Sequence, residues 1–166
     1  FNNIYGKIRR HQKGDKQYEK VENSKLINTN INESNKAQEI IVREQGQRFK
    51  INLTDYLDTG LFFDHRNLRL TVRNECRKKN VLNLYCYTGS FSVYAATGKA
   101  RSVCSVDLSN KYLRWTEENM RLNGITTGFA ESKVGPDLFG KNEPDEEKSE
   151  FLPGSKYVFV NGDVCN

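Results

Sequence analysis

A glycine and an aspartate, each following a short apolar segment, have the spacing needed to bind a nucleoside cofactor. Residues 80–84 lead to Gly89, and the segment 102–106 ends at Asp107, eighteen residues after that glycine. A strand, a tight glycine turn and a helix, followed by a strand that ends in a carboxylate, form the nucleoside-binding unit of α/β sheets. In that unit the glycine lets the ligand approach the backbone, and the carboxylate accepts hydrogen bonds from ribose hydroxyls.

The glycine pattern narrows the choice of cofactor. Residues 87–92 contain one glycine, not the G-x-G-x-x-G of dinucleotide sites, and the chain has no P-loop or G-x-S-x-G motif. A turn with one glycine suits a cofactor without a pyrophosphate, and S-adenosylmethionine is the leading candidate. In this interpretation the backbone near Gly89 meets the methionine part, Asp107 binds the ribose, and Asp163 faces the adenine amino group.

Periodicity predicts the elements that position these groups. Helices are expected from Ser90 to about Thr97 and from Ser109, the expected N-cap, to 123–124, and a third buried strand over 156–163. Strands alternating with helices through right-handed crossovers make a parallel sheet. Trp115 is interpreted as a core residue and not as a platform for adenine.

The first half of the chain contains a predicted β-ribbon, a loop, a hairpin and a helix. Residues 1–20 alternate polar and apolar side chains and residues 22–37 are a polar loop, whereas 39–44 and 48–53 flank a glycine and form a hairpin. Beyond residues 54–66, the spacing of apolar residues between Leu68 and Cys76 predicts a helix. His65 and Arg66 lie near the start of this helix; either they are functional, or Asp64 simply caps the helix and Arg66 is a surface charge, and both interpretations stay open.

The charge of the chain is uneven. It has 26 basic and 21 acidic residues, a net charge of +5, and three prolines. Six acidic residues cluster between residues 137 and 150, within the stretch 125–155, a predicted loop insertion that contains all three prolines. A basic end suggests a polyanion such as nucleic acid, and an ordinary solvated surface is the alternative. The candidate RNA-binding residues are the cations of the first segment: Lys7, Arg9, Arg10, Lys13 and Lys16.

Several classes of protein are not indicated. No apolar run approaches the roughly 18 residues of a membrane span, and no signal-peptide pattern opens the chain, which starts without methionine and so suggests a fragment or a processed chain. The four cysteines form no C-x-x-C pair and the two histidines lie far from them, so no metal site is expected. We expect a reduced, cytoplasmic protein.

Three runs of residues resemble one group of methyltransferases. They are residues 52–66 (NLTDYLDTGLFFDHR), 83–90 (NLYCYTGS) and 105–109 (SVDLS), and residues 12–20 (QKGDKQYEK) resemble the basic ribbon that precedes that domain. The group is the N7-guanine methyltransferase half of the bifunctional bacterial 23S ribosomal RNA methyltransferases, within the class I S-adenosylmethionine-dependent family. The resemblance implies a Rossmann-like α/β sheet over 54–166, incomplete at its C-terminus and preceded by a hairpin extension over 1–53.

The resemblance also implies a set of site residues. Arg66 would contact the carboxylate end of the cofactor, for which a guanidinium has the right geometry. The family's Asp/Asn-Pro-Pro motif, which frames the target base, would lie beyond residue 166, so no catalytic residue is named and the chain alone is expected to be inactive. The implied cofactor contacts are Arg66, Asn83, Tyr85, Tyr87, Thr88, Gly89, Ser90, Asp107, Leu108 and Asp163.

The expected reaction is methylation of guanine N7 in 23S ribosomal RNA or its large-subunit precursor. N7 carries its own lone pair, so the reaction needs orientation and no strong general base. One alternative is a cytosine-5 methyltransferase, which would need a nucleophilic cysteine, and Cys86 and Cys165 are poorly placed for that role. The other alternative is a noncatalytic RNA-binding module.

Overall fold

The computed structural model describes residues 5–6, 25–26, 39–56, 58–129 and 157–161. The five candidate RNA-binding cations, Asp163, and most of the predicted 125–155 insertion lie outside the described residues. In chain order the elements are β1 (Tyr5–Gly6), β2 (Lys25–Leu26), β3 (Glu39–Glu44), β4 (Gln47–Asn52), a 3-10 helix (Phe63–His65), α1 (Arg66–Glu75), β5 (Asn80–Leu84), α2 (Ser90–Thr97), β6 (Ser102–Asp107), α3 (Asn110–Leu122), β7 (Gly128–Phe129) and β8 (Tyr157–Asn161).

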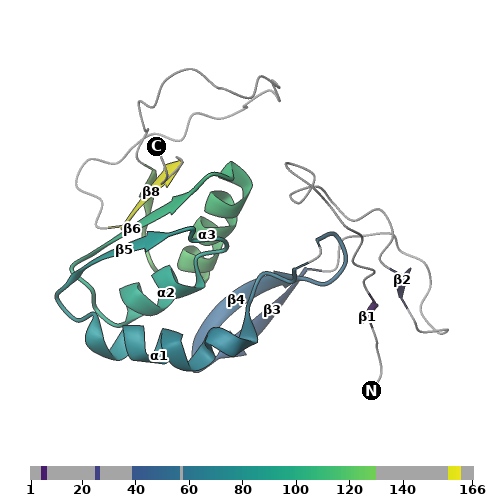
Figure 1. Ribbon diagram of the computed structural model, residues 1–166, viewed down its shortest axis with the longest axis horizontal. Helices are drawn as coiled ribbons and strands as arrows, with labels where there is room; N and C mark the ends of the chain where they lie inside the picture. The colour runs from purple at the N-terminus through teal and green to yellow at the C-terminus, as the bar shows by residue number, and fades with distance from the viewer. Residues whose placement is uncertain (1–4, 7–24, 27–38, 57, 130–156, 162–166) are drawn as a thin grey trace.

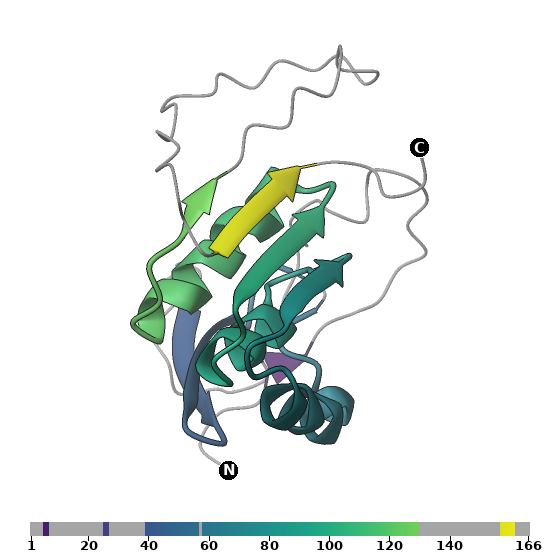
Figure 2. The ribbon, with the colours of Figure 1, turned by 90° about the vertical axis from the view of Figure 1, so that its left-hand side faces the viewer.

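The predicted parallel sheet is confirmed, and its strand order is β5-β6-β8-β7. Figure 2 shows the arrows of β5, β6 and β8 pointing the same way. In this register Asp107 lies opposite Asn161, so the loops that follow the strands meet at one edge of the sheet. Two short strands were not expected: β7 lies in the predicted insertion and β2 in the predicted 22–37 loop. Both pair with strands distant in sequence, which local patterns do not reveal.

The described elements form three layers (Figure 1). Helices α2 and α3 pack against one face of the sheet, and the β3–β4 hairpin and α1 lie on the far side of these helices. The boundary between residues 53 and 54 stays a prediction. The core between the layers contains Phe49, Ile51, Leu61, Cys76, Cys86, Val93, Tyr94, Ala95, Ala96, Ala100, Val103, Leu113, Met120 and Phe159.

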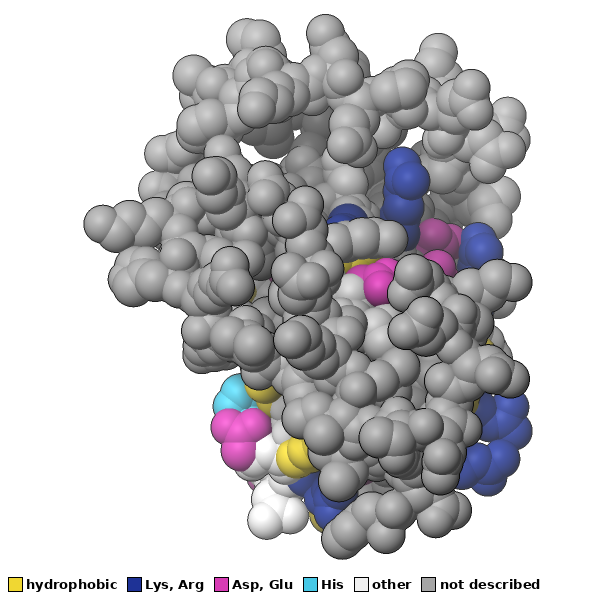
Figure 3. Space-filling model, turned by 90° about the vertical axis from the view of Figure 1, so that its right-hand side faces the viewer, with side chains coloured by type: hydrophobic (Ala, Val, Ile, Leu, Met, Phe, Trp, Pro, Cys, Tyr) yellow, Lys and Arg dark blue, Asp and Glu magenta, His cyan; other side chains and the backbone are white. Residues whose placement is uncertain are grey.

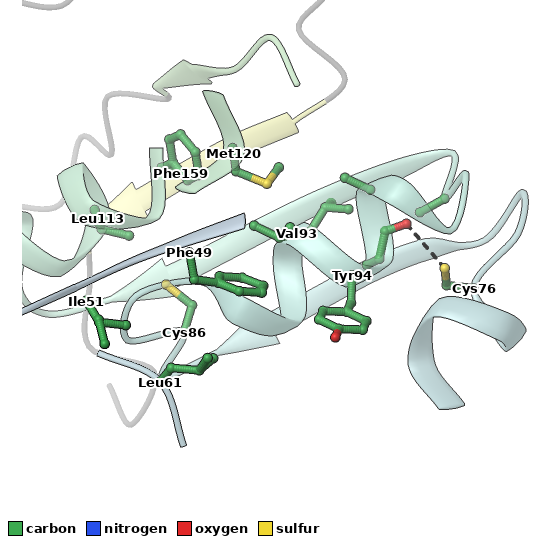
Figure 4. Packing of buried hydrophobic residues seen from close by; sticks show 14 residues of the cluster. Phe49, Ile51, Leu61, Cys76, Cys86, Val93, Tyr94, Leu113, Met120 and Phe159 are labelled. Carbon is green, nitrogen blue, oxygen red and sulfur yellow. Dashed lines mark hydrogen bonds between the residues drawn. The ribbon is translucent and has the colours of Figure 1, made fainter. Parts of the chain in front are cut away.

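The predicted hairpin is confirmed, and its turn explains its register. Gln45 and Gly46 both have left-handed backbones, with φ of 49° and 90°, as a two-residue hairpin turn requires. Glu44 therefore pairs with Gln47. Figure 4 shows Phe49 reaching from β4 toward Tyr94 of α2, and the two rings stack with their centroids 6.1 Å apart. This contact helps to attach the hairpin to the helical layer.

A buried ion pair joins the end of the hairpin's first strand to α1. Arg69 is 0% exposed, and its Nε and Nη2 donate to the two carboxylate oxygens of Glu44 at 2.8 and 2.9 Å. The hydroxyl of Tyr94 donates to Glu44 Oε1 at 3.0 Å, so three elements share one carboxylate. Burial raises the pKa of Glu44, but the hydrogen bonds from Arg69 and Tyr94 and the charge of Arg69 outweigh it and lower that pKa.

The predicted helix over residues 68–76 is confirmed as α1, but its burial and its start differ from expectation. Leu68 is 55% exposed, whereas the side chain that the helix buries is that of Arg69. The reason is tertiary: Glu44, distant in sequence, neutralises the arginine. The interpretation of Asp64 as the cap was wrong, because His65 occupies the N-cap position and makes no side-chain capping hydrogen bond.

One face of β5 remains open to solvent. Asn83 points toward α2, since its Nδ2 donates to Ser92 Oγ at 2.8 Å. Its neighbours Leu82 and Leu84 point to the opposite face, and they are 62% and 41% exposed. Parallel strands are normally buried on both faces. The apolar pattern of this strand therefore predicted more burial than the described residues provide.

None of the helices in the described part of the chain is long and apolar enough to span a membrane.

Replacing Glu44 by glutamine keeps the shape of the side chain but leaves the buried Arg69 guanidinium without a counter-charge. We expect the free energy of unfolding to fall by about 3–5 kcal/mol at neutral pH, measured by urea denaturation. The exposed Arg121, which pairs with Glu117 at 2.7 Å, offers a control, because Arg121→Ala should change stability by about 0.5 kcal/mol or less.

Urea denaturation of Glu44→Gln and of the parent chain over a range of pH also tests the sign of the pH dependence. Because the pKa of Glu44 is lowered in the folded state, the unfolded chain takes up a proton first as the pH falls. The stabilisation is therefore complete above the ordinary carboxyl pKa of 4.5 and is lost below it. Stability that declines as steeply in Glu44→Gln as in the parent chain would contradict this account.

Candidate functional site

The carboxylate of Asp107 joins the two loops at the carboxyl edge of the sheet. Its Oδ2 accepts a hydrogen bond from the backbone N–H of Tyr87 at 2.8 Å, and its Oδ1 accepts one from the N–H of Ser109 at 2.9 Å. Tyr87 belongs to the β5–α2 turn, and Ser109 caps α3, as predicted. A carboxylate oxygen can accept a second hydrogen bond, so Asp107 can also bind hydroxyl groups of a ligand.

The β5–α2 turn has an unusual backbone. Tyr85, Tyr87 and Gly89 are left-handed, with φ of 54°, 52° and 72°. The left-handed region costs a non-glycine residue about 1–2 kcal/mol. Hydrogen bonds hold the turn in place: the N–H of Cys86 donates to Val106 O at 2.9 Å, and the N–H of Gly89 donates to Cys86 O at 2.8 Å. The strain thus falls in the turn that the sequence singled out.

The structure gives Gly89 a second reason to be glycine. A Cβ at this position would lie 2.2 Å from Cγ2 of Thr116, so a helix fills the space beside the glycine. Thr116 is fully buried, and its hydroxyl donates to the carbonyl oxygen of Tyr87 at 2.9 Å. The sequence predicted a close approach by ligand to backbone here, and the structure adds a close approach by α3.

Aromatic rings surround Tyr87. Its ring centroid lies 4.6 Å from that of Tyr112 in an edge-on contact, 5.3 Å from Phe62 and 6.5 Å from Trp115. Burial raises the pKa of the Tyr87 hydroxyl, and the neighbouring Tyr112 and Asp58 raise it further. Tyr87 therefore stays neutral and acts as a structural wall of the turn.

Four further predicted cofactor residues lie on the same edge with different surroundings. Thr88 is 1% exposed and its hydroxyl donates to the carbonyl oxygen of Gly60. Asn83 is tied to Ser92, and Ser90 is the first residue of α2. Leu108 is 58% exposed, and its carbonyl oxygen accepts a hydrogen bond from Asn161. Their contacts with a cofactor stay predictions.

Arg66 lies at the start of α1, where its Nε donates to Glu44 Oε2 at 3.2 Å. The side chain is 54% exposed, so its remaining nitrogens can reach a ligand. The preceding residue, His65, has its ring 5.9 Å from that of Phe91 in the first turn of α2. Arg66 is thereby brought toward the same end of α2 as Gly89.

Sequence reasoning missed the buried residues that support the turn from behind. Asn119 is 0% exposed, and it accepts a hydrogen bond from Lys50 N–H through Oδ1 and donates to Thr88 O through Nδ2, both at 2.8 Å. Trp115 is core, as predicted, but its Nε1 donates to Lys50 O of the hairpin at 3.0 Å. The sequence did contain one signal of this role: Asn119 is a polar residue on the apolar face of the helix predicted after Ser109.

Cys86 does not have the properties of a nucleophile. Its side chain is buried, with 5% exposure, and burial raises the pKa of the thiol to about 12. The thiolate is the reactive form, and this site suppresses it. Cys165, the other cysteine considered for a cytosine-5 mechanism, lies outside the described residues. Among the residues that the structure describes, no cluster of three or more His, Cys, Asp or Glu side chains could hold a metal ion.

Comparison with known families identifies a methyltransferase family. Residues 20–144 match the family described as S-adenosylmethionine-dependent methyltransferase. The ribosomal RNA large subunit methyltransferase K/L of Alteromonas mediterranea is 52% identical over 124 residues, which are 75% of this chain and 16% of that protein. The protein of the same name from Shewanella frigidimarina is 48% identical over 120 residues, 72% of this chain and 15% of its own length. The chain thus spans about one sixth of these relatives.

Solved structures share the fold. The SAM-dependent methyltransferase from Agrobacterium tumefaciens has a TM-score of 0.54 and 25% identity, over 74% of this chain and 36% of that one. The protein SMU.776, solved in complex with SAH, has a TM-score of 0.58 and 25% identity, over 81% of this chain and 29% of that one.

Gly89→Ala should destabilise the chain more than the same change at Gly124. Both glycines have nearly the same φ, 72° and 71°, but a Cβ at Gly124 would meet nothing within 4 Å. Gly124→Ala should therefore cost only the backbone strain, about 1 kcal/mol, whereas Gly89→Ala adds overpacking against Thr116 of about 1–3 kcal/mol. Urea denaturation measures both, and equal losses would contradict the close packing of α3.

Cys86 should resist alkylation while the chain is folded. At a pH equal to the ordinary thiol pKa of 9.0, a pKa of about 12 lowers the thiolate fraction by about two to three orders of magnitude. Iodoacetamide labelling followed by peptide mass mapping should show slow modification of Cys86 in buffer and fast modification in urea. Equal rates in the two conditions would show an exposed and ionised thiol.

Proposed function

Because the chain belongs to the S-adenosylmethionine-dependent methyltransferase family, we propose that it binds S-adenosylmethionine at the carboxyl edge of its sheet and serves the methylation of guanine N7 in 23S ribosomal RNA. The observation that carries the proposal is the position of Asp107. Its carboxylate ends β6, fixes the turn that contains Gly89, and keeps acceptor capacity for hydroxyl groups.

The residues at this edge fit the chemistry of the cofactor. Asp107 would accept hydrogen bonds from the ribose, the backbone of residues 85–89 would lie along the methionine part, and Arg66 would pair with its carboxylate. Bound there, the cofactor supplies a methyl group on an electrophilic sulfonium. SMU.776, whose structure contains SAH, shares this fold. In the proposal Asp163 faces the adenine, as the sequence suggested.

The proposed target needs positioning and no proton removal. Guanine N7 has its own lone pair, so the protein has to orient the base and exclude water. A cytosine-5 reaction would need an ionisable cysteine, and the buried thiol of Cys86, with its pKa near 12, does not supply one. The names of the relatives support ribosomal RNA as the substrate.

Two finer parts of the proposal concern RNA and turnover. Contacts with RNA phosphates are assigned to the cations of the first segment, Lys7, Arg9, Arg10, Lys13 and Lys16, which carry the charge such contacts require. Because the chain corresponds to 15–16% of its relatives' length, we expect cofactor binding without methyl transfer by this chain alone. Binding is accordingly the informative readout.

Removal of the Asp107 carboxylate should abolish cofactor binding. Calorimetric titration of S-adenosylmethionine and S-adenosylhomocysteine into the chain should show binding that Asp107→Ala weakens by about 100-fold or more, because the ribose loses its acceptor and the turn loses its anchor. Asp107→Asn retains one acceptor oxygen and should weaken binding by about tenfold.

A surface acid and a test of folding complete this experiment. Glu75, exposed at the end of α1, is the matched control, and Glu75→Ala should leave the affinity unchanged. Circular dichroism establishes that each variant is folded. Unchanged affinity in a folded Asp107→Asn chain, or a folded parent chain that binds neither ligand, would refute the proposed site.

A further inference from the structure

The exposed large aromatic side chains of the described residues are confined to two segments, residues 62–63 at the start of the 3-10 helix and the turn after β5. Large apolar side chains with substantial exposure elsewhere are aliphatic, and they lie on the hairpin, α1, β5 and the loop after β6: Ile40, Ile41, Leu68, Leu82, Leu84 and Leu108. The aromatic ones are Phe62, Phe63 and Tyr85, with 43%, 63% and 63% exposure. Single exposed apolar residues are common, but a gathering of one chemical type points to a ligand.

The first of these segments contacts the second, which is the candidate cofactor turn. The ring of Phe62 lies 5.3 Å from that of Tyr87, whose backbone N–H donates to Asp107. Tyr85 belongs to the same strained turn, two residues before Tyr87. The ring of Phe62 therefore contacts the residue whose backbone N–H is bound by the carboxylate proposed to bind the ribose, and Phe63 is its neighbour in the chain.

The residues that follow Phe63 in the chain have polar and charged side chains. The ring of His65 lies 6.1 Å from that of Phe62, and its side chain is 49% exposed. Arg66, the proposed partner of the cofactor carboxylate, follows with 54% exposure, while the neighbouring Asp64 carboxylate, 3.7 Å from His65, is turned to solvent with 77% exposure. On the face seen in Figure 3, the histidine and acidic side chains stand beside apolar ones.

We propose that Phe62, Phe63 and Tyr85 form a stacking surface that holds an unpaired RNA base beside the cofactor turn. The inference rests on the proposed function and names the residues that would position its substrate. Aromatic faces bind unpaired bases by stacking, whatever the base. Enzymes that modify a base bring it out of its stack, which leaves its faces free for such contacts.

Fluorescence anisotropy with the whole chain tests the stacking surface. The probe is a fluorescein-labelled, guanine-containing single-stranded RNA hexamer, compared with a hexamer of the same charge that lacks its bases. Phe62→Leu and Phe63→Leu keep apolar bulk but remove the π face, and each should weaken binding of the base-containing RNA about fivefold or more. Phe63→Trp should retain or strengthen binding, and Leu68→Ala is the matched exposed apolar control, expected to change nothing.

The outcomes separate this inference from the cofactor proposal. Equal binding of the two hexamers, unchanged affinity in both leucine variants, or no binding of the parent chain to RNA would overturn it. Sedimentation of the parent chain as a dimer and of the leucine variants as monomers would also overturn it, since the rings would then contact a second copy of the chain. Calorimetry with S-adenosylmethionine on Phe63→Leu should show unchanged affinity. If the parent chain binds the base-containing RNA through these rings but not the cofactor, the proposed function fails and the stacking surface stands.

Discussion

The candidate site depends on one carboxylate that serves two loops. Asp107 accepts hydrogen bonds from the N–H groups of Tyr87 and Ser109, so the turn after β5 and the start of α3 cannot move independently. This shared acceptor acts together with the backbone hydrogen bonds of Cys86 and Gly89 and with the hydrogen bond from Thr116 to Tyr87, which also hold the left-handed turn. The same group is the natural partner for ribose hydroxyls, so the residue that would bind the ligand also shapes the surface on which it would lie.

Residues of α3 connect the carboxyl edge of the sheet to the hairpin on the other side of the helical layer. Asn119 connects the hairpin strand β4 to the carbonyl oxygen of Thr88, and Thr116 fills the space beside Gly89. Farther along, the ion pair of Glu44 and Arg69 fastens the hairpin to α1. The hairpin is thus part of the scaffold of the site, since its backbone hydrogen-bonds with residues whose other contacts define the turn.

The chemistry of the site is one of positioning. Three titratable groups at the turn hold backbone or stay neutral: Asp107 accepts backbone N–H groups, burial keeps Cys86 protonated, and burial keeps Tyr87 neutral. A transfer to an atom that already has a lone pair asks no more of a protein than orientation and exclusion of water. In the proposed reaction, the exposed rings of Phe62 and Phe63 would help to orient a planar base beside the turn.

The sequence by itself determined the main helices and longer strands, the parallel sheet, the hairpin and the family, because these follow from periodicity, turn residues and short motifs within a few neighbours of each other. It also singled out Asp107 and Gly89. Only the tertiary structure decided that Arg69 is buried while Leu68 is exposed, that Thr116 packs against Gly89, and that the side chain of Thr88 faces Gly60. These outcomes depend on partners 25 to 28 residues away, such as Glu44 for Arg69 and Gly60 for Thr88. No local pattern records such partners, because a charge or a hydroxyl is buried only where a distant group satisfies it.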